Sequence, residues 1–104
     1  MERTRERTMR SDSAPRFLRL DARDNVAVAL ITLELGERLR VGEAELIIAG
    51  RIPMGHKFAL EPIDQGGTIV KYGEIVGQAV VDIPAGSHVH VHNVVSARLP
   101  GTRS

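Results

Sequence analysis

The chain has 104 residues, of which 42% are hydrophobic and 26% charged, and its formal net charge is +1, as expected for a single globular domain. The absence of cysteine excludes a disulfide scaffold, a thiolate metal site and a thiol nucleophile. No apolar run approaches the ~20 residues of a membrane span, and the charged N-terminus lacks the apolar segment of a signal peptide. We therefore expect no membrane association and a cytoplasmic location.

The N-terminal segment is basic, with six arginines against three acidic residues among residues 1–19. Residues 1–16 contain few apolar residues and no strand alternation, which predicts a flexible basic extension. We expect the folded domain over residues 17–98 and a C-terminal tail over residues 99–104. With two Phe, one Tyr and no Trp, the chain is poor in base-stacking side chains, so we expect no nucleic-acid partner.

From Phe17 onward, glycine and proline divide the chain into short segments that are often β-branched, which is typical of strands. Only residues 21–35 are long enough for a helix, and their continuous VAVALITL core favours a buried strand instead. Residues 37–48 could contain one helical turn. The pattern predicts an all-β, barrel-like or clip-like fold with one or two short helical turns. The predicted strands are residues 26–33, 45–49, 57–60, 68–72, 76–81 and 88–95.

An internal repeat relates residues 52–63 to residues 83–94 at an offset of 31. Ile, Pro and Gly coincide in the two copies, so each copy predicts a turn that starts a strand. Two such units could be related by a pseudo-two-fold. If the apolar residues of these strands point into the core, then the intervening histidines point away from it. The expected inward residues are Phe58, Leu60, Val89 and Val91.

Three of the four histidines alternate at His88, His90 and His92, which suggests a metal site because neutral imidazole is a common metal ligand. On a straight strand His88 and His92 lie about 13 Å apart, too far to share an ion, whereas His90 and His92 are about 6.6 Å apart and can converge. A third ligand would come from His56, a carboxylate or a partner chain. The alternative, that these are simply exposed polar positions on a strand, remains open.

Three further side chains are candidates for chemistry, and each also has a structural interpretation. His56 follows a turn and could be functional or could stabilise that turn. Lys71 could bind a substrate carboxylate or be solvated. Tyr72 could donate a proton or pack against the domain.

Four segments in this order resemble one known family: residues 24–29, 52–60, 69–77 and 86–93. They are similar to the SAF domain of the altronate/galactarate dehydratase family and to the small subunit of sulfolactate sulfo-lyase. The resemblance implies a β-clip fold. It also implies a reaction that eliminates water, or sulfite in one branch, from a hydroxy acid to give an enol that becomes a 2-keto acid.

The resemblance further implies a divalent metal, iron or manganese, shared with a much larger catalytic chain that this sequence does not contain. On that basis we expect a small subunit that is inactive without its partner and that could form homo-oligomers. The matched motifs suggest catalytic roles for His56, Lys71 and Tyr72, substrate binding by Lys57 and Asn93, and metal ligation by His90, His92 and, less firmly matched, His88. The alternatives are a sulfolactate sulfo-lyase subunit and a non-catalytic SAF module that binds a sugar or a partner protein.

Overall fold

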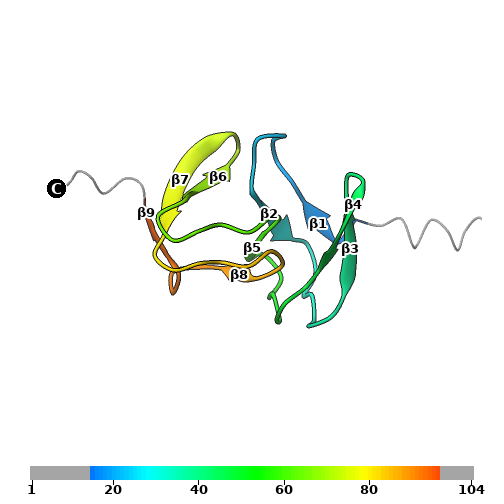
Figure 1. The fold of residues 1–104 in the computed structure, drawn as a ribbon. Coiled ribbons are helices and arrows are strands. Elements are labelled where there is room, and N and C mark those ends of the chain that lie inside the picture. The colour runs from blue at the N-terminus through cyan, green and yellow to red at the C-terminus, as the bar shows by residue number, and fades with distance from the viewer. Residues whose placement is uncertain (1–14, 97–104) are drawn as a thin grey trace, which may run out of the picture.

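The computed structural model describes residues 15–96, and within that range the chain contains strands and turns but no helix (Figure 1). The predicted all-β fold is confirmed, and its many short antiparallel strands agree with a β-clip. No helix in this range is long and apolar enough to cross a membrane. The strands are β1 Phe17–Leu18, β2 Val26–Ala29, β3 Arg38–Val41, β4 Ala44–Ile47, β5 Lys57–Ala59, β6 Thr68–Lys71, β7 Glu74–Ala79, β8 His88–Val89 and β9 Val94–Ser96.

The expected helical turn within residues 37–48 is wrong, because that segment forms the β3–β4 hairpin. Its connection is the dipeptide Gly42-Glu43, and Gly42 adopts φ 63°. Positive φ at the first central position is what a tight two-residue hairpin turn requires, and glycine adopts it without steric cost. The local turn chemistry therefore selects a hairpin rather than a helix.

The strands form three antiparallel sheets, with a central sheet in the order β1-β2-β5-β8. The two-stranded β3–β4 sheet lies on one side of it and the β6-β7-β9 sheet on the other (Figure 1). The predicted flexible extension falls mostly on residues 1–14, which lie outside the described residues, as does the whole predicted tail over residues 99–104. Arg16 is part of the fold, because its side chain bonds Glu37 Oε1 at 2.9 Å and the Arg38 carbonyl at 2.9 Å.

The internal repeat is confirmed by the hydrogen bonds, which occur twice in the same pattern. Leu33 and Ile52 exchange two backbone bonds of 2.9 and 2.8 Å, and Ile63 and Ile83 exchange two of 2.8 and 2.7 Å. Each bridge closes a loop that contains one hairpin and is followed by a turn into a strand of the central sheet. We call residues 33–58 the first repeat unit and residues 63–89 the second repeat unit.

A β-bulge accounts for the one-residue difference between the two units. Val70 pairs with Ile75 and Ile69 pairs with Gly77, so Val76 is the extra residue between the paired positions. Corresponding positions are therefore 30 residues apart before the bulge and 31 after it. The first repeat unit has no such insertion, since β3 and β4 pair without a shift in register.

The core consists of two neighbouring apolar clusters, one beside each hairpin. Phe58 and Val89 are fully buried as expected, and Leu60 is partly buried. The inward orientation expected for Val91 is wrong, because its side chain is 82% exposed. The predicted strand over residues 88–95 is broken, since β8 ends at Val89 and residues 91–93 form a turn before β9.

Candidate functional site

The turn after β8 is held by the side-chain amide of Asn93. Its Oδ1 accepts the backbone N–H of His90 at 2.9 Å, and its Nδ2 donates to the His88 carbonyl at 2.8 Å. The Asn93 N–H also donates to the His90 carbonyl at 3.0 Å. Asn93 is buried and its amide bonds are used within the chain, so the structure gives it a structural role, and the substrate-binding role stays a prediction.

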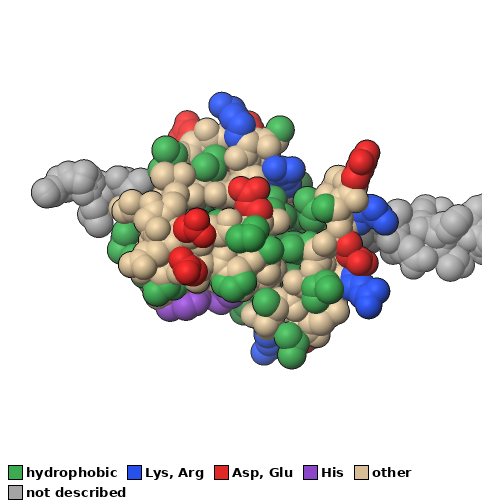
Figure 2. Space-filling view, in the orientation of Figure 1, with side chains coloured by type: hydrophobic (Ala, Val, Ile, Leu, Met, Phe, Trp, Pro, Cys, Tyr) green, Lys and Arg blue, Asp and Glu red, His purple; other side chains and the backbone are tan. Residues whose placement is uncertain are grey.

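This turn brings the alternating histidines closer together than a straight strand would. The ring centroids of His88 and His92 are 5.4 Å apart, so the separation of about 13 Å expected for a straight strand is wrong, although His92 is not among the histidines whose nitrogens lie within 4.8 Å of one another. The expectation failed because it assumed a continuous strand, whereas the chain turns after Val89. Figure 2 shows the histidine side chains gathered at one edge of the molecule.

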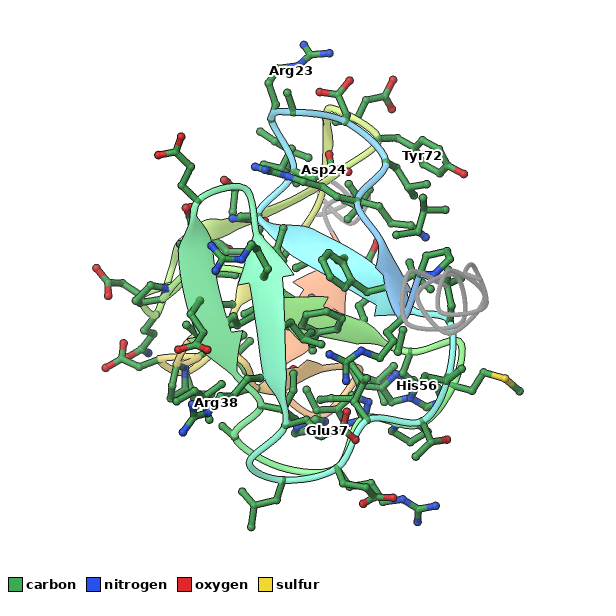
Figure 3. All side chains as sticks on the ribbon, turned by 90° about the vertical axis from the view of Figure 1, so that its right-hand side faces the viewer. Arg23, Asp24, Glu37, Arg38, His56 and Tyr72 are labelled. Carbon is green, nitrogen blue, oxygen red and sulfur yellow. The ribbon has the colours of Figure 1, made fainter. Side chains whose placement is uncertain are left out.

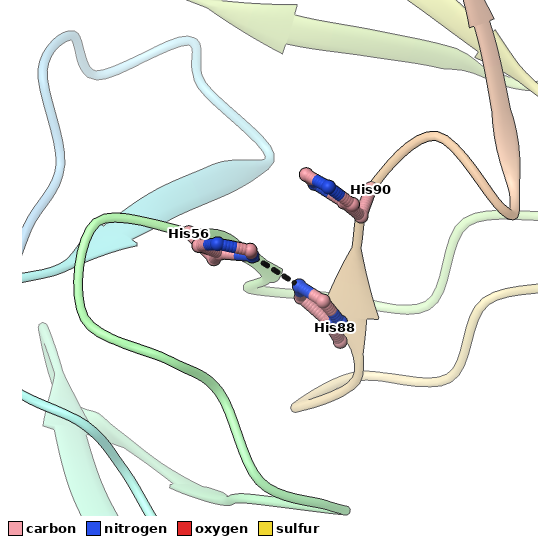
Figure 4. Close-up of side chains that lie close together, drawn as sticks. All are labelled: His56, His88 and His90. Carbon is pink, nitrogen blue, oxygen red and sulfur yellow. Dashed lines mark hydrogen bonds between the residues drawn. The ribbon is translucent and has the colours of Figure 1, made fainter.

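Three histidines form a cluster, His56, His88 and His90, which we call the histidine trio (Figure 4). One nitrogen from each of them lies within 4.8 Å of the others. His56 Nδ1 and His88 Nε2 form a hydrogen bond of 2.8 Å, and the His56 and His90 rings stack at 4.6 Å. Of the three sources considered for a further ligand, His56 is the one that the structure brings to this site.

The pairing of β5 with β8 explains why residues so far apart in sequence meet. Lys57 pairs with Val89 in an antiparallel register, so His56 lies opposite His90 just beyond the paired residues. Directly opposed residues of antiparallel strands have Cβ atoms about 4.5–5.5 Å apart. His92 is exposed and borders the trio through its contact with the His88 ring.

The electrostatics of the trio favour neutral imidazoles at His88 and His90. Burial lowers the pKa of His88, and the neighbouring His56, His90, His92 and Lys57 lower it further. Loss of hydration also lowers the pKa of His90, with smaller contributions from His56, Lys57 and His92. Unprotonated imidazole nitrogens have the free electron pair that a metal ion needs, and they suit iron and other borderline divalent metals. The three residues therefore fit a divalent metal by donor type and spacing, and the lowered pKa values of His88 and His90 favour the unprotonated form at these two.

A pocket of about 340 Å³ adjoins the trio, and His90 belongs to both. Lys57 and Lys71 contribute the charge, and the extra bulge residue Val76 forms part of the wall. Burial lowers the pKa of Lys57, and the charge of Lys71 lowers it further. The complete lining is Lys57, Ile69, Lys71, Val76, Val89, His90, Val91, Val94 and Ser96.

Of the two candidates in the β6–β7 turn, Lys71 reaches the pocket and Tyr72 does not line it. Tyr72 is 64% exposed at the tip of the hairpin, with φ 60°. Figure 3 shows it well separated from His56. Its ring flanks Lys71, whose Nζ is 5.6 Å from the ring centroid, near the outer limit of a cation–π contact.

Asp24 and Asn25 have no predicted role of their own, although they lie in the family-like segment 24–29. Asp24 Oδ1 accepts the Gly73 N–H at 2.8 Å, and Asn25 Oδ1 accepts the Val70 N–H at 2.8 Å. Lys71 lies between these two attachment points, so the pair fixes the backbone that carries it. An Asp-Asn pair before a buried strand was the available signal, since both side chains commonly hydrogen-bond backbone groups at turns.

Comparison with known proteins extends the resemblance over most of the chain. The family described as altronate/galactarate dehydratase SAF domain matches residues 15–97. The chain is 43% identical over 77 residues to altronate dehydratase of Escherichia coli (strain K12), covering 74% of this chain and 16% of that protein. It is 34% identical over 89 residues to (2R)-sulfolactate sulfo-lyase subunit alpha of Chromohalobacter salexigens, covering 79% of this chain and 95% of that subunit. Galactarate dehydratase (L-threo-forming) of Escherichia coli (strain K12) is 37% identical over 86 residues, which are 81% of this chain and 16% of that enzyme.

Proposed function

Because the chain belongs to the altronate/galactarate dehydratase SAF domain family, we propose that it forms part of a lyase that eliminates water from a hydroxy acid, together with a larger catalytic chain. The observation that carries this proposal is the histidine trio beside a lysine-lined pocket, joined by His90. A pure binding module needs no cluster of metal-ligating type. The chain spans 16% of the length of each altronate dehydratase that it matches, so most of each of those enzymes lies outside the matched region.

In this proposal the pocket binds the substrate and the adjoining histidine trio binds a metal ion. Lys71 and Lys57 bind the acidic groups of the substrate in the pocket by charge-assisted hydrogen bonds, which are stronger than neutral ones. His56, His88 and His90 hold a divalent metal, iron or manganese. When bound, such an ion supplies Lewis-acid assistance to the departing hydroxide and to the developing enolate.

Proton transfer is assigned to imidazoles and to the partner rather than to Tyr72. The four histidine rings form one continuous group, in which His92 is the exposed member next to His88. An imidazole can transfer a proton or ligate a metal ion, so in this proposal the exposed His92 serves either as a proton donor or as a fourth ligand. Tyr72 flanks Lys71 outside the pocket lining and has no direct part in this mechanism.

A second candidate keeps the chemistry and changes the leaving group to sulfite. It is favoured by one observation, that the chain covers 95% of the length of one sulfolactate sulfo-lyase subunit alpha and shares 34% identity with it. A protein named as a subunit has a partner, so this relative also supports the two-chain arrangement. Both candidates need the same abstraction of a proton next to a carboxylate and differ in the group that leaves.

The test is an assay of the full chain with altronate, galactarate and sulfolactate, with and without a large dehydratase chain of the same organism. We expect no turnover by the chain alone and turnover by the mixture. The preferred substrate distinguishes dehydratase from sulfo-lyase. Turnover by the isolated chain would refute the two-chain proposal, and an inactive mixture with all three acids would refute the lyase.

A further inference from the structure

The distribution of lysine in this chain is uneven in a way that points to a ligand. The sequence contains twelve arginines but two lysines, Lys57 and Lys71, and both lysines line the same pocket. Arginine is always charged and pairs with planar groups through its fixed fork, whereas lysine presents a compact charge on a flexible stem. The chain therefore places its two compact cations together and uses arginine for its other basic residues.

No acidic residue lines this pocket, and in residues 15–96 neither lysine forms an ion pair. The ring of Tyr72 offers Lys71 a π face but no counter-charge. Two like charges at one half-buried site repel each other and lose hydration, so the arrangement costs folding free energy. A ligand with two negative charges would remove that cost, and a ligand with one would remove part of it.

Both lysines are held by backbone contacts that fix where each stem begins. Lys57 lies in β5 between its two partner strands, opposite Val28 in β2 and Val89 in β8. Lys71 ends β6, and the side chains of Asn25 and Asp24 anchor the residues on either side of it, Val70 and Gly73. The two cations thus come from different sheets and meet across the pocket between them.

The pocket volume and its remaining walls limit what can bind. About 340 Å³ lies at the lower end of the range for small-molecule sites. Most of the remaining wall is apolar, so polar selectivity rests on the two ammonium groups, His90 and Ser96. The apolar wall residues are Ile69, Val76, Val89, Val91 and Val94.

We propose that this pocket selects small dianions, molecules with two acidic groups on a short carbon chain, over monoanions of the same length. Each acidic group pairs with one lysine, and the chain between them lies against the valine and isoleucine side chains. That the dianion is also the substrate rests on the proposed function. The selectivity itself is a property of the pocket and does not depend on catalysis.

The experiment is a calorimetric titration of the full metal-free chain at low ionic strength with succinate and with butyrate, which share a four-carbon chain and differ in one carboxylate. We expect succinate to bind about tenfold more tightly or better, the value of one additional hydrogen bond between charged groups. Lys57→Gln and Lys71→Gln should each bring the two affinities to near equality. Arg51→Gln, which removes the same charge from an exposed side chain paired with Glu34, should keep the preference.

Three results would overturn the inference: equal binding of the two acids, a succinate preference that survives both lysine changes, or an equal loss in the Arg51 variant. Circular dichroism of each variant shows whether the fold is intact. If Lys57→Gln unfolds, Lys71→Gln at the end of β6 still tests the inference. Dianion selectivity in a chain that never supports turnover would refute the lyase and leave this inference standing. Turnover without dianion selectivity would support the lyase and refute this inference.

Discussion

The two repeat units share one backbone design, yet the pocket lies beside the hairpin of the second. In the first unit Leu39 pairs with Leu46, and both side chains are buried in the core. At the corresponding place in the second unit Ile69 pairs with Gly77. Without a side chain at Gly77, β9 lies directly against β7, and Val94 packs against that cluster. The missing side chain at Gly77 thus leaves room for a third strand beside the second hairpin.

The other differences between the units lie at the same place. Val41 of the first hairpin is a partly buried apolar residue, and its counterpart in the second is Lys71. The bulge adds Val76, and both Lys71 and Val76 line the pocket. Bulges are common next to binding sites because they redirect side chains. In this chain the pocket therefore lies where the second unit departs from the pattern that it shares with the first.

Gly77→Ala should produce the largest effect on stability. A Cβ at Gly77 would lie 2.7 Å from Val94 Cγ1 and 2.8 Å from the Val95 carbonyl oxygen, so β9 must move. Overpacking of this kind costs about 1–3 kcal/mol, and we expect the upper part of that range because a backbone atom is involved. Gly50→Ala is the matched control, since a Cβ there meets no atom within 4 Å. Chemical denaturation measures both, and equal stabilities would contradict the role assigned to Gly77.

The side chains that attach the two hairpins to the rest of the chain should contribute less to the free energy of unfolding than Gly77→Ala removes, and their contributions should differ from each other. Asp24 is buried and bonds the second hairpin through Gly73, whereas Arg16 bonds the first hairpin from an exposed position. We expect Asp24→Ala to cost about 1 kcal/mol, because the lost bond is partly offset by removal of Asp24 Oδ2, which is buried without a partner. Arg16→Ala should cost about 0.5 kcal/mol, as exposed ion pairs do. Urea denaturation measures both variants. A larger loss of unfolding free energy in Arg16→Ala than in Asp24→Ala would contradict this ranking of the two attachments.

Much of the scaffold can be predicted from the sequence, because β-branched segments, turn residues and the repeat are local signals. The strands at Val26, Lys57 and Thr68 begin where the pattern places them. Val91 was assigned inward because alternation alone cannot reveal that a strand has ended. The decisive residue is Asn93, whose amide satisfies two backbone groups and closes the turn.

The candidate site was predictable only in part, because strand pairing and sheet packing between distant segments bring its residues together. The involvement of His56 with the alternating histidines was one of three open alternatives, and pairing of β5 with β8 brings it there. The close approach of His88 to His92 depends on the turn and was missed. The pocket between Lys57 and Lys71 depends on two sheets packing together, which no spacing within one segment reveals.

The proposal that His56, His88 and His90 form a metal site where the two repeat units meet is tested most directly by metal titration of the full chain. We expect one Mn²⁺ or Fe²⁺ ion per chain at pH 7.5 and weaker binding at pH 5.5, because protonation removes the ligand electron pairs that the lowered pKa values of His88 and His90 keep free at neutral pH. His56→Ala, His88→Ala and His90→Ala should each weaken binding by about tenfold or more. His92→Ala should have less effect, since His92 lies outside the trio. Absence of metal binding by the folded chain, or affinity unchanged by all three substitutions, would contradict the account.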